Sequence, residues 1–131
     1  MTNDDETLAG AVSGTGTLSL ASGSTLELNS SVSTGETVAY DGLATLGLSL
    51  ANEFSGTISG FGTGDAIDAQ NFQYGSTSIV FNPNSQNTGG TLTLTDGPLV
   101  ANISMTGSYT TNDFQPNQEL NGGTGTLIKF V

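Results

Sequence analysis

The sequence has no cysteine and no histidine, and Lys129 is its one basic residue against twelve acidic residues. Without cysteine, the chain can form neither a disulfide nor a thiolate-based zinc or redox site. Without histidine, it cannot build a Ser-His-Asp catalytic triad. The net charge of −11 argues against nucleic acid and against anionic membrane surfaces as partners, because both are bound through lysine and arginine.

Long apolar runs are also missing. No stretch approaches the ~18 apolar residues of a membrane span, so we expect no membrane insertion. The acidic start, MTNDDETLAG, lacks the basic-then-apolar layout of a signal peptide. Charged residues make up only 10% of the chain, while Ser, Thr, Asn and Gly are abundant. This composition suits a secreted bacterial surface protein, so we expect an extracellular, cell-surface location reached without a recognisable N-terminal signal peptide.

The most informative feature that is present is an internal repeat of twenty residues. The segments GTGTLSLASGSTLEL, TGETVAYDGLATLGL and FSGTISGFGTGDAID begin at residues 14, 34 and 54. Aligned on one another, they place Thr-Leu, Thr-Val and Thr-Ile pairs at residues 17, 37 and 57. A second set falls at residues 25, 45 and 66, the last one residue late. Such a fixed period indicates a repeat architecture.

Within each segment, apolar residues alternate with Thr, Ser, Glu and Gly, as in Leu18/Leu20, Leu26/Leu28 and Val38/Tyr40. This period of two predicts half-buried strands, and the intervening Gly, Ser, Asn and Asp predict turns. We therefore expect an all-β protein with a short parallel β-solenoid of about three coils, stacked at about 4.8 Å. The alternatives are an antiparallel meander of hairpins, or an antiparallel β-sandwich or jelly roll.

The repeat ends near residue 75, which suggests three parts. Residues 1–13 form an acidic tail that could be an exchanged strand, residues 14–75 form the solenoid, and residues 76–131 form an antiparallel cap. The sequence TDGP between two alternating runs predicts a hairpin over residues 91–105. Residues 82–90 and 110–123 are expected to be long polar loops, where binding often occurs.

These motifs resemble the β-solenoid repeats of large secreted bacterial surface proteins and adhesins. Those proteins include autotransporter-like passengers and type I-secreted, haemolysin-type proteins. The segment FSGTISGFGTGDAIDAQNF is similar to one that such proteins often carry, and GGTLTLTDGPLVANISMTGSY resembles the strand pair that follows it. The resemblance covers roughly residues 14–131 and implies an extracellular, non-catalytic module.

The glycine-rich segment TISGFGTGDAIDAQNF is a candidate for ligand binding. It has no lysine for a phosphate-binding P-loop, and its aspartates would repel phosphate. Calcium is a possible cofactor, with Asp65 and Asp68 as ligands, although the nonapeptide register of haemolysin-type sites is not matched. The alternative is structural: Gly62 and Gly64 turn the coil while Asp65 caps the turn. No other cofactor is expected.

Catalysis has little support in the sequence. Two carboxylates could supply a hydrolytic pair in a groove, but this is true of almost any acidic protein, and we expect a non-enzyme. The tyrosines Tyr74 and Tyr109, which lie next to Gly and Ser, could provide a sugar-stacking platform. A calcium-dependent glycan-binding module is therefore the alternative function.

The preferred function is structural: a self-assembling fibre, a surface-array subunit or an adhesin module. A short solenoid has open ends, and an open strand edge is a template for a further strand. The tail can pack as a strand against its own body or against a neighbouring copy, in the manner of β-augmentation. We predict a homo-oligomer or filament formed by end-to-end or edge-strand contacts, with Leu8, Ala9, Ala11 and Val12 at the contact.

Overall fold

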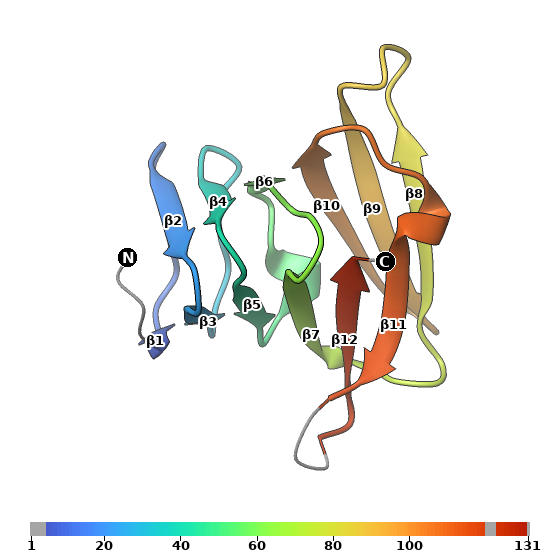
Figure 1. Ribbon diagram of the computed structural model, residues 1–131. Helices are drawn as coiled ribbons and strands as arrows, with labels where there is room; N and C mark the ends of the chain where they lie inside the picture. The colour runs from blue at the N-terminus through green and yellow to red at the C-terminus, as the bar shows by residue number, and fades with distance from the viewer. Residues whose placement is uncertain (1–4, 120–122, 131) are drawn as a thin grey trace.

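The computed structural model describes residues 5–119 and 123–130 and contains two six-stranded sheets (Figure 1). The first sheet has, in spatial order, β1 (Asp5–Leu8), β3 (Thr25–Leu28), β5 (Thr45–Leu48), β7 (Ala66–Gln73), β12 (Gly125–Phe130) and β11 (Phe114–Gln118). The second sheet has β2 (Thr17–Ala21), β4 (Thr37–Asp41), β6 (Thr57–Ser59), β10 (Leu99–Thr106), β9 (Gly89–Asp96) and β8 (Ser78–Pro83). Two short 3₁₀ turns complete the elements, η1 (Ala51–Glu53) and η2 (Thr111–Asp113).

The N-terminal part of both sheets is a parallel solenoid of roughly three turns, which confirms the predicted fold class. Thr17, Thr37 and Thr57 are direct partners in the second sheet. Leu26, Leu46 and Ile67 are partners in the first. The spacing of twenty therefore corresponds to one coil. The meander is wrong for this region, because strands adjacent in the sequence lie in different sheets.

A third side of the coil was not recognised in the sequence. It consists of single-residue bridges that join Val12 to Val32 and Val32 to Phe54. The step from Val32 to Phe54 is longer than twenty residues because η1 is inserted before Phe54, and the following connection to β6 is shorter. The coil thus absorbs an insertion on its irregular side while β4 and β6 keep their register.

The alternation along the strands explains why the coils stack. Every second residue points inward, so Leu26, Leu46 and Ile67 lie above one another in the core and have no exposed surface. Burying one such side chain contributes about 1.5–3 kcal/mol. The residues between them face outward, where threonine and serine side chains can form hydrogen bonds with water. A slip by one residue would reverse both faces, and this fixes the register.

The C-terminal strands extend the same two sheets instead of forming a sheet of their own. β12 pairs antiparallel with β7, and β11 pairs antiparallel with β12. β10 pairs parallel with β6, and the predicted β9–β10 hairpin is present, with Gly97 at φ 62° in its turn. The hydrophobic core is continuous from Leu20 to Ile128.

The prediction of a long loop over residues 110–123 is wrong in part. That segment contains η2 and strand β11, although its sequence is rich in Gln, Asn and Pro. Its strand conformation depends on pairing with β12, a contact that the local composition does not encode. No helical segment in the described ranges is long and apolar enough to cross a bilayer.

Candidate functional site: the two ends of the stack

Asp65 holds together the glycine-rich turn between β6 and β7. Its carboxylate accepts the backbone N–H of Ala44 at 3.0 Å and that of Gly62 at 2.9 Å, and the side chain is buried. Burial raises the pKa of Asp65, and the two N–H bonds oppose that rise. Gly64 has φ 90°, a conformation that favours glycine. One carboxylate oxygen thus caps the turn at Gly62, and the other ties the turn to Ala44 of the preceding coil.

Asp68 lies three residues further on, at the outer face of β7, among different partners. Its Oδ1 is buried without a hydrogen-bond partner in the described structure. Burial, followed by the hydrogen bond and charge of Glu119, raises the pKa of Asp68 to about 8. Glu119 in turn accepts the N–H of Gly125 at 2.9 Å, so the two carboxyls meet where β11 leads toward β12.

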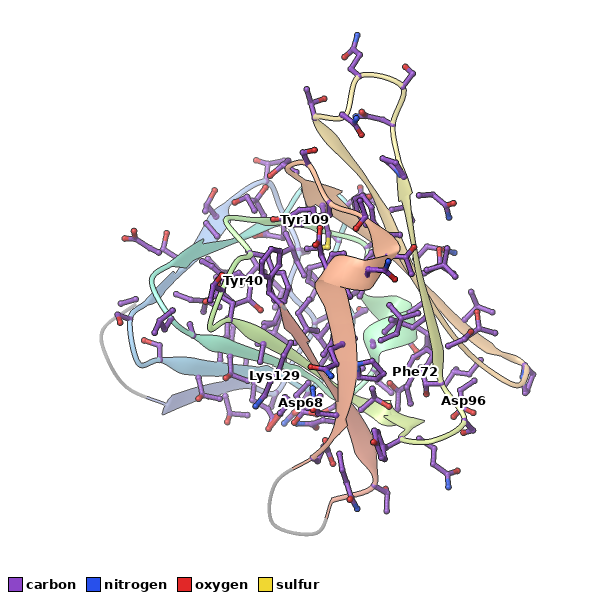
Figure 2. The ribbon with its side chains drawn as sticks, turned by 45° about the vertical axis from the view of Figure 1, so that its right-hand side comes forward. Tyr40, Asp68, Phe72, Asp96, Tyr109 and Lys129 are labelled. Atoms are coloured by element: carbon purple, nitrogen blue, oxygen red, sulfur yellow. The ribbon has the colours of Figure 1, made fainter. Side chains whose placement is uncertain are left out.

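Glu27 and Gln70 complete this acidic cluster. Gln70 Nε2 donates to Glu27 Oε1 across Gly47, and a side chain at residue 47 would collide with both groups. Leu127 on β12 is the register partner of Asp68, and Lys129, two residues further on, lies on the same face of the sheet. Figure 2 labels Lys129 and Asp68. No group of three or more His, Cys, Asp or Glu within the described ranges is arranged to hold a metal ion. Asp65 and Asp68, the predicted calcium ligands, serve separate networks.

The two tyrosines considered for sugar binding are not brought together. Tyr74 is 43% exposed in the turn after β7, whereas Tyr109 is 9% exposed. The Tyr109 hydroxyl donates to the carbonyl of Phe61 at 2.5 Å, and burial raises the pKa of Tyr109. Tyr109 therefore packs in the core (Figure 2), and the pair does not form an exposed platform.

Tyr109 belongs to an aromatic cluster that fills the C-terminal end of the core. Phe114 stacks on Phe61 and Phe81 at centroid distances of 5.8 and 5.5 Å, and Tyr109 is 5.4 Å from Phe114. Tyr40 and Phe130 meet Phe61 edge-on. Such pairs add about 0.5–1.5 kcal/mol each beyond their buried area. We call the part of the molecule bounded by β8, β11 and this cluster the closed end.

The strand edges of the closed end are also blocked. Thr111 Oγ1 accepts the N–H of Phe81 at 3.0 Å and donates to the Phe81 carbonyl at 3.3 Å, so both backbone groups are occupied. Pro83 in β8 and Pro116 in β11 have no N–H to offer. Asn117 Nδ2 donates to the Gln115 carbonyl at 3.1 Å. These are standard means of preventing edge-to-edge association.

Among the described residues, none covers the opposite end of the stack, formed by β1, β2 and Val12. Three internal ladders begin there, and each runs through three coils: Leu8–Leu28–Leu48, Val12–Val32–Phe54 and Leu18–Val38–Ile58. In every ladder the second and third side chains are at most 3% exposed, whereas the first is only partly buried. We call this surface the open end.

The backbone of the open end is unpaired on its outer side. Within the described ranges, β1 and β2 are the terminal strands of their sheets and have a neighbour on one side only. Val12 likewise bonds to the second coil, donating to Ser31 and accepting from Ser33, both at 2.9 Å. β1 is paired with β3 of its own chain, which is one of the two arrangements predicted for the tail. Residues 1–4 lie outside the described ranges.

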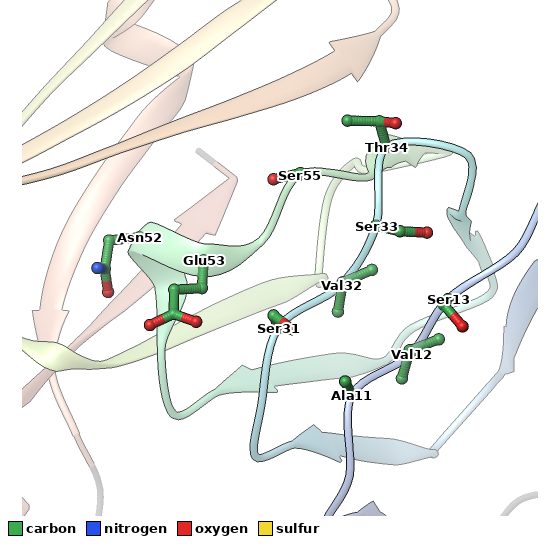
Figure 3. Close-up of a pocket in the computed structure, with 10 residues that line it drawn as sticks. All are labelled: Ala11, Val12, Ser13, Ser31, Val32, Ser33, Thr34, Asn52, Glu53 and Ser55. Atoms are coloured by element: carbon green, nitrogen blue, oxygen red, sulfur yellow. The ribbon is translucent and has the colours of Figure 1, made fainter.

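Two shallow hollows adjoin the open end. One, of about 450 Å³, is lined by residues 7–13. The other, of about 600 Å³, crosses the third side of the coil beside Val12, Val32 and Glu53 (Figure 3). Ala9 and Ala11 are exposed at these hollows, beside the partly buried Leu8 and Val12. The four predicted assembly residues thus lie together.

The sequence predicted Leu18 as the first member of a core ladder, which the structure confirms, but not as a residue of the open end. Thr111 and Glu119 were not predicted at all, because their partners Phe81 and Asp68 are 30 and 51 positions away. No protein-family model, curated protein or solved structure matches the chain.

Proposed function

We propose that the protein is an extracellular, non-catalytic structural module of the bacterial surface, of the adhesin or surface-array kind, whose copies join through the open end. One observation carries the proposal. The three core ladders have their first members partly exposed, while the other end of the same core is sealed by aromatic side chains and blocked edges.

The free energy gained by burying apolar surface favours the docking of a second copy of the chain at the open end. A docked copy would cover Leu8, Val12 and Leu18, and burying apolar surface stabilises association by about 25 cal/mol per Å² before the costs of association. It would also pair backbone groups at the outer edge of β2, which has no neighbour there among the described residues. The scarcity of charge with abundant Ser, Thr, Asn and Gly, and the resemblance to secreted surface repeats, support an extracellular site of action.

The proposal is tested by measuring mass against concentration with light scattering coupled to gel filtration. The wild-type chain is expected to shift from monomer to a larger species as concentration rises. The double variant Ala9→Glu and Ala11→Glu should remain monomeric, because both alanines are exposed and the added charges repel the partner without disturbing the core. Thr88→Glu, at an exposed turn far from the open end, is the matched control and should associate normally. A wild-type chain that stays monomeric at every concentration refutes the proposal.

A further inference from the structure

The open end has a defined backbone direction. Thr37 and Thr57 donate their N–H groups toward the preceding coil, to the Gly16 carbonyl at 3.0 Å and the Glu36 carbonyl at 2.9 Å. Thr17 occupies the same place in its coil, so its N–H points away from β4, toward the open side. Backbone direction alternates along a strand, so the N–H of Ser19 points outward too. β2 therefore presents a row of hydrogen-bonding groups that have no partner within residues 5–119 and 123–130.

The closed end presents only an interrupted edge to this row in a head-to-tail stack. On β8, the terminal strand of the same sheet, Thr111 occupies the N–H and carbonyl of Phe81. Pro83 supplies no donor. The surface that remains for β2 is therefore the open end of a second copy.

Charge decides which strand forms the centre of such a contact. β1 has the acidic sequence DETL. β2 has the sequence TLSLA, with no charged side chain. Like charges directly opposite each other across a strand pair are destabilising, so β2 is the strand that can pair with itself.

We infer that two copies join head to head, with the β2 strands antiparallel across a two-fold axis near Ser19. This inference rests on the proposed function and specifies its partner and orientation. A two-fold axis makes the contact self-complementary, so that one surface serves both molecules. The assembly ends at two copies, because both closed ends face outward. The predicted filament is thereby replaced by a bivalent pair.

Single cysteines test the orientation directly, because the chain has none of its own. Ser19 on β2 and Ser78 on β8 are both exposed serines on terminal strands of the same sheet. Under mild oxidation, Ser19→Cys should form a disulfide-linked dimer and Ser78→Cys should stay monomeric. A mixture of the two variants, one carrying a mass tag, should give no mixed dimer.

Any other result of the cysteine experiment contradicts either the orientation, the position of the contact or the proposed function. Mixed Ser19→Cys/Ser78→Cys dimers would show head-to-tail stacking and overturn the orientation while leaving the proposed function intact. A wild-type chain that associates while Ser19→Cys links to neither partner would place the contact away from β2. No association of the wild type would refute the proposed function itself.

A backbone variant gives a second, independent readout. Ser19→Pro removes an outward N–H and no bond within the molecule, so the monomer should fold and its association should weaken about tenfold or more. Ser19→Ala keeps the N–H and is the matched control, which should associate like the wild type. Equal association of the proline variant and the wild type would overturn the inference. Because net charge opposes the contact, association of the wild type should strengthen as salt is raised.

Discussion

The open end and the closed end finish the same two sheets in opposite ways. At the closed end, Phe61, Phe81, Phe114 and Tyr109 fill the core, while Thr111 and two prolines block the edges. At the open end, Leu8, Val12 and Leu18 are partly exposed and the edges are free. A coil buries its apolar side chains and pairs its backbone fully only where another coil lies on each side. At each end of the stack, other residues must therefore cover the core and the strand edges, or these stay exposed.

The largest loss of stability is expected from removing an aromatic ring from the core of the closed end. Phe114→Ala removes the ring that stacks on both Phe61 and Phe81, and we expect a loss of about 3–5 kcal/mol in the free energy of unfolding. Urea denaturation measures this loss. Tyr74→Ala, which truncates an exposed aromatic side chain, should change stability by less than about 0.5 kcal/mol. Similar losses for the two variants would mean that the aromatic cluster does not seal the core.

A matched pair of substitutions in one ladder sharpens the comparison. Leu28→Ala should cost about 2–5 kcal/mol because Leu28 is 1% exposed. Leu8→Ala, at the partly buried start of the same ladder, should cost less than about 1.5 kcal/mol in the monomer but weaken self-association. Denaturation at low concentration measures the first quantity and light scattering measures the second. Equal losses of monomer stability would contradict an open end.

The acidic cluster makes stability depend on pH. The pKa of Asp68, raised from 3.8 to about 8, leaves its carboxyl protonated when folded and ionised when unfolded across that interval. The folded state then binds the extra proton, so stability is full below about pH 4 and falls as the pH rises toward 8. One proton gives a slope of at most about 1.4 kcal/mol per pH unit, and the partial solvent exposure of Asp68 reduces it.

Asp68→Asn should flatten this decline, measured as the free energy of unfolding between pH 5 and 8.5. Glu27 on β3, Glu119 just after β11 and Lys129 on β12 are the other ionisable groups of this face and remain unchanged in that variant. Asp96→Asn is the control: bonds from the Ser76 hydroxyl and the Gln73 N–H lower the pKa of Asp96, so its titration lies below the tested interval. A decline that persists in Asp68→Asn would assign it to other groups.

The smallest effect on stability is expected for Thr111→Val. This substitution also removes the difference between the two ends most directly, because it unblocks an edge of the closed end. It removes two hydrogen bonds to the Phe81 backbone at a cost of about 1 kcal/mol. It also frees the edge of β8, so the variant should form species larger than the wild-type assembly at the same concentration. Thr63→Val, at an exposed position of the turn between β6 and β7, leaves the bonds to the Phe81 backbone in place and serves as the control in light scattering. An unchanged size would show that Thr111 does not protect the edge.

The sequence predicted the coils well because their information is local and repeated. Thr17, Thr37 and Thr57 occur at the period of the structure, and alternation around Leu26 and Leu46 marks the buried face. The late position of Ala66 was also correct, since it pairs with Thr45 after the turn capped by Asp65. When a unit is repeated, its copies can be aligned with one another to check which residues are equivalent, and a single strand offers no such check.

The rest depended on contacts between distant segments. The pairing of β10 with β6 joins residues 104 and 57, and nothing near either residue indicates the other. Strand β11 was missed because Gln, Asn and Pro are typical of loops, and its pairing with β12 overrides that preference. Tyr109 follows Gly and Ser, a setting typical of exposed turns, yet its hydroxyl reaches Phe61 in the core.

The stacking of coils on nearest neighbours has a consequence for how the molecule opens. Local opening should begin at β1 and β2, where each strand has one neighbour, and advance coil by coil toward the aromatic cluster. Amide hydrogen exchange would then be fast in residues 5–21, slower in β4 and β5, and slowest in β7, β9 and β10. The protein would carry a gradient of local stability along its axis, and occupation of the open end would slow exchange along the whole of it.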